Sequence, residues 1–337
     1  MVNNYYDILI LGAGPAGLSA AVTINSTDLR ALVIDYKQKD VWNGYPIESI
    51  HPGVIRQLEY LDMATNIEKC FRGKYSCISD GVKSKNLNPY SEEIWYGYHI
   101  CKNTFNTLLC DNAEQKGVHI KKVITKPIIE RLVSRGYKVV VGAEQYSCKF
   151  IVDATGRKRA GQKNFKSIVT KYSPDCLVVS GIQKQRDKQL MDNESAYFLP
   201  YKNYWIWLGH LDDGRQCWTA VFKKRDWKAF KKEFLPIDLR TADRWTSITW
   251  EFASQLDIPG FLICGEAASL LDPASGKGIY QAIESGVMAA KAVDDIFVYP
   301  SEERSIKFAY EAWMRERFCL MVDQLKSSYE ELGIKLE

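Results

Sequence analysis

The residues with the clearest chemical potential form a glycine-rich turn near the N-terminus, written Gly12-Ala13-Gly14-Pro15-Ala16-Gly17. The first glycine permits a tight turn, the second lets the backbone approach a pyrophosphate, and the third lets a helix pack on a strand. The helix N-terminus that follows offers free amide donors and the positive end of its dipole. We therefore expect a dinucleotide pyrophosphate to bind at Gly12, Gly14, Pro15, Ala16 and Gly17.

The segments around this turn have the pattern that the motif requires. Residues 6–11 form a short apolar run typical of a buried parallel strand, residues 18–25 favour a helix, and residues 30–35 predict a second buried strand. Asp35 ends that strand, eighteen positions after Gly17, where a carboxylate can accept hydrogen bonds from ribose hydroxyls. We expect Asp35 and the adjacent Tyr36 to contact the adenosine half. The alternative is a tight turn that binds no ligand.

A second motif, Asp153-Ala154-Thr155-Gly156, follows a strand predicted over 147–152. The small residues Ala154 and Gly156 would let the backbone pass close to a nucleotide. The alternative is an ordinary exit from a strand into a turn.

A third motif combines a carboxylate with a glycine-flanked loop before a helix predicted over 278–297. Glu266 follows Gly265 at the end of a predicted strand, where its carboxylate could bind a chain of sugar-like hydroxyls. The loop then places the positive end of a helix dipole against whatever lies in front of it. The expected binding residues of this motif are Gly265, Glu266, Pro273, Gly276, Lys277 and Gly278. An ordinary capped helix is the alternative.

In this order, the three motifs resemble the FAD-dependent oxidoreductases of the p-hydroxybenzoate hydroxylase fold. The third is most similar to the branch that contains geranylgeranyl reductases, tryptophan halogenases and tryptophan-oxidising flavoprotein monooxygenases. Residues 44–53 resemble the loop of this branch beside the isoalloxazine, and residues 98–105 resemble its segment in which a basic residue meets FAD. The resemblance implies FAD as the cofactor and Lys102 as that basic residue. Glu266 stands where the branch has Asp, and Lys102 where it has Arg, which loses bidentate contact but keeps the charge.

The implied fold class is α/β: a Rossmann-like FAD-binding domain with an inserted antiparallel β-sheet substrate domain and a C-terminal helix. We expect the FAD-binding domain at 1–160 and 255–300, with the loop 41–98 contributing to the active site. The substrate domain is expected at 165–254, where aromatic, alternating strands dominate and a helix is predicted over 227–234. The C-terminal helix is expected within 301–337. Its predicted apolar stripe is Ile306, Ala309, Trp313, Leu320, Leu325, Tyr329 and Leu332.

The leading hypothesis for the reaction is a monooxygenase, in which reduced FAD reacts with oxygen to give a C4a-hydroperoxide that hydroxylates an aromatic substrate. That substrate could be indole- or tryptophan-like, or borne by a peptide. Glu48 and His51 are the expected catalytic residues, since a histidine that titrates near neutrality can act on such a substrate; alternatively His51 caps a turn before Pro52. Residues expected at the substrate are Trp205, Trp207 and His210, with packing inside the sheet as the alternative for each.

Three other functions stay open. A reductase or dehydrogenase of a carbon–carbon bond, similar to geranylgeranyl reductase, would need an aliphatic channel. A halogenase would need a catalytic lysine, for which Lys74 is only the nominal candidate, and Leu208-Gly209-His210 follows Trp205-Ile206-Trp207 where halogenases have Ile-Pro. A non-catalytic escort protein of the same fold would lose the FAD motifs. No second complete glycine fingerprint is visible, so NAD(P)H binding transiently, or a separate flavin reductase, is expected to supply electrons.

Composition sets the remaining expectations. The net charge of +4 is mildly basic, and no nucleic-acid-binding module accompanies it. Nine cysteines without a metal-type or disulfide-type spacing favour free thiols in a reducing compartment. The apolar N-terminal run is interrupted by glycines and a proline, which is unlike a signal peptide or a membrane span. We therefore expect a cytoplasmic protein with no bound metal, no nucleic-acid partner and no membrane span.

Overall fold

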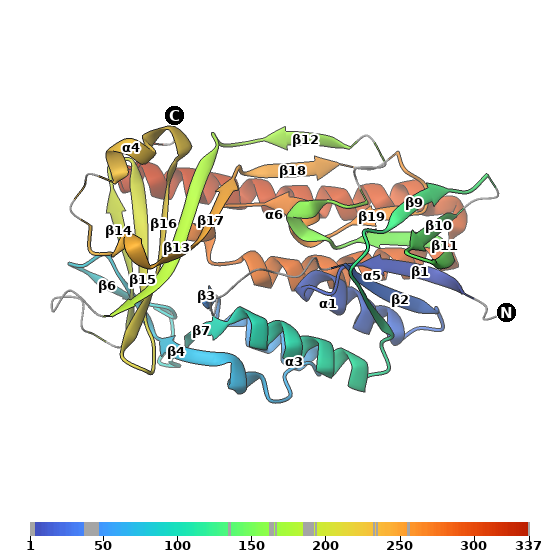
Figure 1. The fold of residues 1–337 in the computed structure, drawn as a ribbon, viewed down its shortest axis with the longest axis horizontal. Helices are drawn as coiled ribbons and strands as arrows, with labels where there is room; N and C mark the ends of the chain where they lie inside the picture. Colours follow the sequence, from blue (N-terminus) through green and yellow to red (C-terminus); the bar gives the residue numbers. More distant parts are fainter. Residues whose placement is uncertain are drawn as a thin grey trace.

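The computed structural model describes residues 4–36, 47–133, 136–161, 165, 167–184, 192, 194–231, 233, 235–254 and 257–335. It is a mixed α/β structure with two large sheets, two small ones and a long C-terminal helix (Figure 1). The predicted fold class is therefore confirmed. The division into an FAD-binding and a substrate domain stays a prediction.

The first sheet contains the N-terminal strand and is parallel over most of its width. Residues of the central strands are almost wholly inaccessible on both faces, as apolar runs such as Ile8–Leu11 require. The parallel strands are β8 (Ile120–Val123), β2 (Ala31–Tyr36), β1 (Tyr5–Leu11), β11 (Glu144–Asp153) and β19 (Phe261–Ile263). The antiparallel hairpin strands β10 (Tyr137–Val141) and β9 (Ile128–Arg131) extend the sheet beyond β11.

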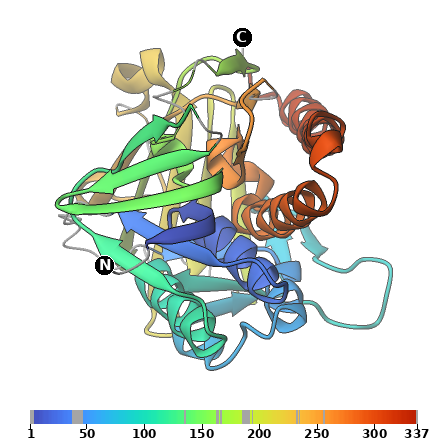
Figure 2. The same cartoon turned by 90° about the vertical axis from the view of Figure 1, so that its right-hand side faces the viewer.

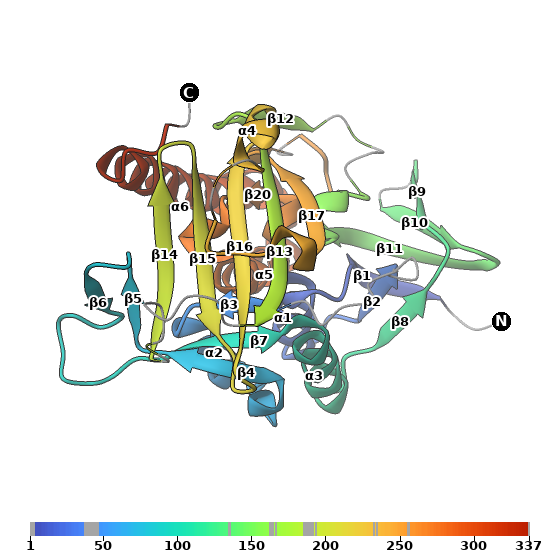
Figure 3. The same ribbon diagram turned by 60° about the vertical axis from the view of Figure 1, so that its left-hand side comes forward.

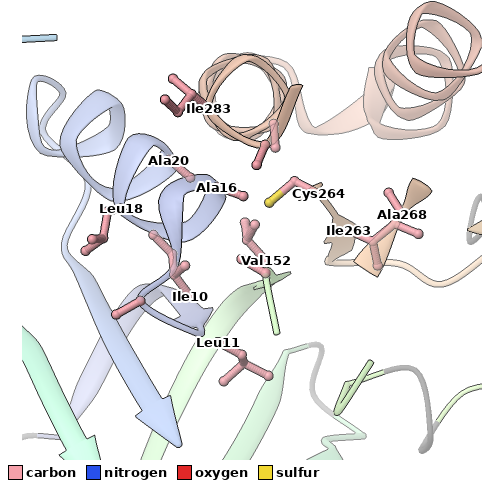
Figure 4. Close-up of a cluster of buried hydrophobic side chains, with 14 of the residues drawn as sticks. Ile10, Leu11, Ala16, Leu18, Ala20, Val152, Ile263, Cys264, Ala268 and Ile283 are labelled. Atoms are coloured by element: carbon pink, nitrogen blue, oxygen red, sulfur yellow. The ribbon is translucent and has the colours of Figure 1, made fainter. Parts of the chain in front are cut away.

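Two helices pack against each other over this sheet. Helix α1 (Pro15–Asn25) begins three residues before the predicted start, because proline is favoured at the first helical position. It lies against α5 (Gly278–Val298), with Ala16 and Ala20 of α1 facing Ile283 of α5 (Figure 4). Helix α3 (Lys102–Gln115) packs on α1 as well. The small side chains bring the first and third motifs to one place.

The second sheet has seven strands, whose broad faces Figure 3 shows. In order across the sheet they are β17 (Ala242–Ile248), β13 (Cys176–Lys184), β16 (Arg215–Lys223), β15 (Tyr204–His210), β14 (Ser195–Tyr201), β5 (Cys77–Ser79) and β6 (Ser84–Asn86). The first five are the antiparallel sheet expected within 165–254. The last two come from the segment 41–98 and cover the edge of β14, which would otherwise present unpaired backbone groups.

Two small sheets lie beside these. One contains β3 (Ile47–Ile50), β7 (Gly97–Cys101) and β4 (Phe71–Tyr75), with α2 (Gly53–Tyr60) directly after β3. The other contains β12 (Ile168–Lys171), β18 (Glu251–Ser254) and β20 (Ser269–Leu270). The ends of the expected substrate segment thus belong to a separate sheet. Of the helix predicted over 227–234, α4 spans Trp227–Phe230, and residues 232 and 234 lie outside the described residues.

Helix α6 (Glu303–Glu331) runs along one side of the molecule, from the region of the first large sheet to that of the second, and packs beside α5 (Figures 1 and 2). Its buried residues are Lys307, Tyr310, Met314, Phe318, Val322, Leu325 and Tyr329. Only Leu325 and Tyr329 belong to the predicted apolar stripe, and Leu320 is exposed. The predicted stripe is thus correct in part: Ile306 and Trp313 are only partly buried but also pack against the core. The sequence did not predict a buried Lys307, whose ammonium donates to the carbonyl of Ile258. None of the described helices is long and apolar enough to cross a bilayer.

The contact between α1 and α5 leads to a prediction about Gly286. A Cβ atom built on Gly286 would lie 2.1 Å from the carbonyl oxygen of Ala16, so Gly286→Ala must push the helices apart. We expect the free energy of unfolding, measured in urea, to fall by about 1–3 kcal/mol. Lys291→Ala on the exposed side of the same helix is the control and should change it by less than about 0.5 kcal/mol. An increase in stability for Gly286→Ala, as helix propensity alone predicts, would contradict this packing.

Candidate functional site

The three sequence motifs meet at the carboxyl ends of β1, β11 and β19. A Cβ on Gly12 would lie 2.6 Å from the carbonyl oxygen of Ala154, and one on Gly265 would lie 2.8 Å from Cβ of Ala16. Gly156 in turn faces the Glu266 carboxylate, 3.8 Å from its would-be Cβ. Segments separated by more than a hundred residues therefore share one surface, the position where parallel α/β sheets bind ligands.

The first motif fits a dinucleotide pyrophosphate. Gly14 is the N-cap of α1, and no side chain caps the helix, so its first amides are available to an anion. A Cβ on Gly14 would meet no atom within 4 Å, which leaves open space in front of the helix. The Asp35 carboxylate is buried and accepts from the Ala13 amide at 3.1 Å. Asp35 therefore stabilises the glycine-rich turn. The predicted contacts of Asp35 and Tyr36 with the adenosine half of a cofactor stay predictions.

The second motif contains a carboxylate whose role the sequence did not indicate. Asp153 is fully buried and accepts from the Thr155 amide, the Thr155 hydroxyl and the Gly161 amide, at 2.9, 2.6 and 2.9 Å. These bonds fix the turn that carries Ala154 and Gly156. Arg157, directly after Gly156, donates to the Glu266 carboxylate at 3.2 Å. Arg157 therefore belongs to the site, although no motif included it.

A cavity of about 300 Å³ opens beside these motifs. One wall is the second sheet, another is β3, and the third is the loop from Leu270 to Gly278 that precedes α5. The predicted residues that line it are Glu48, His51, Trp205, Trp207, Gly265, Glu266, Pro273, Gly276 and Gly278. Lys102 and Lys277 do not line it, and Gly44, Tyr45 and Pro46 of the predicted isoalloxazine loop lie outside the described residues.

The loop before α5 leaves room for a planar group. Neither Gly276 nor Gly278 would bring a Cβ within 4 Å of any atom, so the backbone here is open to a ligand. Lys277, the N-cap of α5, makes no side-chain capping bond, and the helix begins with its amides directed at this space. These residues fit the isoalloxazine of FAD, as the resemblance implies.

Trp205 and Trp207 both line the cavity, and each indole N–H is already bonded. Trp207 Nε1 donates to Ser49 Oγ at 2.9 Å, and Trp205 Nε1 donates to Tyr329 Oη at 2.5 Å. The prediction that His210 contacts the substrate is corrected here. Its side chain points to the opposite face of β15, with its ring edge-on to Tyr197, and it does not line the cavity. Side chains alternate across a strand, so 205 and 207 share a face that 210 cannot.

Glu48 forms a charged cluster with two basic side chains. Its Oε1 accepts from Lys102 Nζ at 2.5 Å and from Arg244 Nη1 at 3.2 Å. Burial raises the pKa of Glu48, but the two cations outweigh that effect and hold the pKa at about 2. Glu48 is therefore an anion at neutral pH, so it has no proton to donate there and is only a weak base. Lys102, expected to contact FAD, pairs with Glu48; a bond to FAD stays a prediction.

His51 lies at the junction of β3 and α2. Its Nδ1 accepts from the Gly53 amide at 3.0 Å, the turn-capping arrangement that was the alternative for this residue. Burial and the positive charge of Lys277 lower the pKa of His51. The neutral ring therefore carries its proton on Nε2, which makes it a donor, while a catalytic role stays a prediction.

A buried polar network joins the C-terminal helix to this cavity. Asp272 lines the cavity and accepts from Trp250 Nε1 at 3.1 Å and from the Ala274 amide at 2.9 Å. Tyr329 of α6 also bonds to Asp272 and accepts from Trp205. Burial raises the pKa of Asp272 although these donors oppose the rise. The sequence placed Asp272 in the third motif, but it placed Tyr329, fifty-seven residues later, only in the apolar stripe of the C-terminal helix.

No metal centre is evident in this part of the chain. Within the described ranges, no group of three or more His, Cys, Asp or Glu side chains is arranged to hold an ion.

The chain is similar in sequence to several enzymes, although no family model matches it. It is 21% identical over 345 residues to the 1H-pyrrole-2-carbonyl-(peptidyl-carrier protein) chlorinase of Pseudomonas fluorescens, covering 86% of this chain and 76% of the relative. It is 24% identical over 328 residues to the digeranylgeranylglycerophospholipid reductase of Methanosarcina acetivorans, covering 86% and 75%.

Its fold is also that of a solved hydroxylase structure. The peptidyl tryptophan dihydroxylase QhpG, essential for tryptophylquinone cofactor biogenesis, superposes with a TM-score of 0.74 and 17% identity over 98% of this chain and 76% of that chain. The predicted resemblance to a branch with reductases, halogenases and tryptophan-oxidising enzymes is thereby confirmed. At 17% sequence identity, this structural similarity shows the fold alone.

The charged cluster leads to a prediction about acid stability. Because the pKa of Glu48 is about 2 in the fold against 4.5 for the free side chain, its stabilising effect is complete above pH 4.5 and is lost as pH falls toward 2. Glu48→Gln should lower the free energy of unfolding at pH 7 by about 1–3 kcal/mol, and the difference from wild type should shrink below pH 4.5. Glu93→Gln, in an exposed pair with Arg56, is the control and should have little effect. A difference that does not depend on pH would show that charge is not the cause.

The environment of His51 leads to a second prediction. Its pKa should lie below 6.5 in a histidine NMR titration, with the resonance assigned by comparison with His51→Asn, whose side chain can still accept from the Gly53 amide. Lys277→Gln should raise the pKa, since a nearby positive charge is removed. Lys291→Gln, farther along α5, should leave it unchanged. Since folding disfavours the protonated form, acid below pH 6.5 should cost stability. An equal pKa in wild type and Lys277→Gln would refute the electrostatic cause.

Proposed function

We propose that the protein is an FAD-dependent monooxygenase that hydroxylates an aromatic substrate, indole- or tryptophan-like and either free or borne by a peptide. The observation that carries this proposal is the cavity itself: the open loop of Pro273–Gly278, which fits isoalloxazine, and the indoles of Trp205 and Trp207 line one space. A flat apolar substrate bound on those indoles would face the loop directly. The dihydroxylase QhpG, named for a tryptophan substrate, supports this choice.

Bound FAD would supply the activation of oxygen, and the chain supplies position and shielding. Asp35 and Asp153 hold the turns that would carry the dinucleotide, through the Ala13, Thr155 and Gly161 amides. Trp205 is 2% exposed and keeps water from one wall. Exclusion of water by a bound substrate and cofactor would strengthen the electrostatic interactions within the site.

The protonation states limit which residues can move a proton. Glu48 is fixed as an anion by two cations, and His51 presents an N–H rather than a lone pair beyond its bond to Gly53. His51 is therefore suited to donate a hydrogen bond to a polar atom of the bound pair. Glu48 is suited to keep Lys102 and Arg244 in place.

A second candidate function is reduction or dehydrogenation of a carbon–carbon bond. The cavity lining also includes aliphatic side chains, which are Ile47, Ile78, Leu87, Val178 and Leu271. The reductase of Methanosarcina acetivorans supports this alternative. Halogenation has less support from the site: Lys74 is exposed, lies over the ring of Tyr96 and is outside the cavity, and no lysine is among the described lining residues.

Oxygen labelling separates the two functions. With FAD-loaded protein, NADH, NADPH or a flavin reductase as donor, and indole derivatives as substrates, we expect oxygen uptake in proportion to product. With ¹⁸O₂, mass spectrometry should find one labelled atom in the product. Product formation under strict anaerobiosis would instead support the carbon–carbon reaction. Purified protein that stays colourless after incubation with FAD would contradict both and favour a binding protein.

A further inference from the structure

Four residues of the second sheet form a straight row along the floor of the cavity. Arg244 on β17 is paired with Ser180 on β13, Ser180 with Thr219 on β16, and Thr219 with Trp207 on β15. The four strands lie side by side in Figure 3. All four side chains line the cavity. The row therefore presents a cation, two hydroxyls and an indole in that order.

The row has the length of a small molecule. Neighbouring strands lie about 4.8 Å apart, so the three steps from Arg244 to Trp207 span roughly 14 Å between backbones. The two end residues donate hydrogen bonds to consecutive residues of β3. Arg244 Nη1 donates to Glu48 Oε1 at 3.2 Å, and Trp207 Nε1 donates to Ser49 Oγ at 2.9 Å. The space between floor and β3 thus suits a bicyclic aromatic ring with a short side chain.

The two central hydroxyls are available to a ligand. Ser180 and Thr219 lie on inner strands of the sheet, yet both are partly accessible because they face the hollow. Neither side-chain oxygen has a hydrogen-bond partner within the part of the chain that the structure describes. A hydroxyl without a partner is unfavourable in a close-packed core, so these two are suited to a ligand. Each hydroxyl can donate and accept, so both suit a polar atom in the middle of a bound molecule.

The Arg244 end attracts an anion. Glu48 is shared by Lys102 and Arg244, so these three side chains together carry one positive charge. A guanidinium has five donors in a planar fork that matches a carboxylate. The Trp207 end is apolar and aromatic, with Tyr75 edge-on to the indole at 5.6 Å between ring centroids.

We propose that this row selects an aromatic carboxylic acid, with the acid group at Arg244, a polar atom at Ser180 and Thr219, and the ring at Trp207. The inference rests on the proposed function, because it takes this cavity as the substrate site. It narrows that function to acidic aromatic substrates. It also makes Arg244 the residue that distinguishes acids from their neutral analogues.

A matched pair of probes tests the charge preference. Indole-3-propionate and indole-3-propionamide differ in charge but hardly in shape, and their binding to the oxidised FAD-loaded protein can be measured by calorimetry and by the flavin absorbance change. We expect the acid to bind at least tenfold more tightly. Arg244→Gln should reduce this preference to less than twofold, and Arg244→Lys should restore part of it. FAD content and melting temperature, measured on each variant, would show whether the cofactor site and the fold are intact.

Control variants make the test specific. Arg240→Gln removes an exposed arginine that pairs with Asp238, outside the cavity, and should keep the wild-type preference. Thr219→Val and Ser180→Ala should weaken both probes by a similar factor and leave the preference unchanged. Equal affinities of acid and amide for the wild-type protein, or no binding of either, would overturn the inference. Incorporation of ¹⁸O into a neutral aromatic substrate would then still support the monooxygenase.

Discussion

The structure depends on the close approach of α1 to α5 over the first sheet. Gly17 and Gly286 have no side chains, and this absence lets Gly12 and Ala16 place their carbonyl oxygens where a Cβ would otherwise be. The N-terminal turn and the loop before α5 are brought together by that contact. Without it, the proposed pyrophosphate and isoalloxazine sites could not belong to one cofactor.

The strand β3 has a comparable role on the substrate side. It is short, but its consecutive residues bond to both ends of the polar row of the second sheet, through Glu48 to Arg244 and through Ser49 to Trp207. Ser49 also bonds to the buried His99 at 2.8 Å, where burial and the nearby His210 lower the pKa of His99 to about 3. His99 therefore supports β3 as a neutral ring. The cavity owes its shape to this strand as much as to the sheet.

Much of the fold could be read from the sequence because its signals are local. The turn at Gly12–Gly17, the buried strands of the first sheet and the antiparallel strands after residue 176 each follow from spacing over a few residues. The predictions failed where a distant partner decided the outcome. The buried stripe of α6 includes Lys307, because a carbonyl from another segment satisfies its ammonium. Two strands of the segment 41–98 belong to the second sheet, because β5 pairs with the backbone N–H and C=O groups at the edge of β14.

The sequence by itself identified the three motifs that meet at one surface of the fold, since each needs only glycine, a carboxylate or a helix start at fixed spacing. It also identified Trp205 and Trp207, because alternation places them on one face. Only the tertiary structure decided that Glu48 would be held by Lys102 and Arg244, that Asp272 would meet Tyr329, and that His210 would turn away from the cavity. Charges and hydrogen bonds of this kind act over a few ångströms in space, and the residues that share them are up to 196 positions apart in the chain.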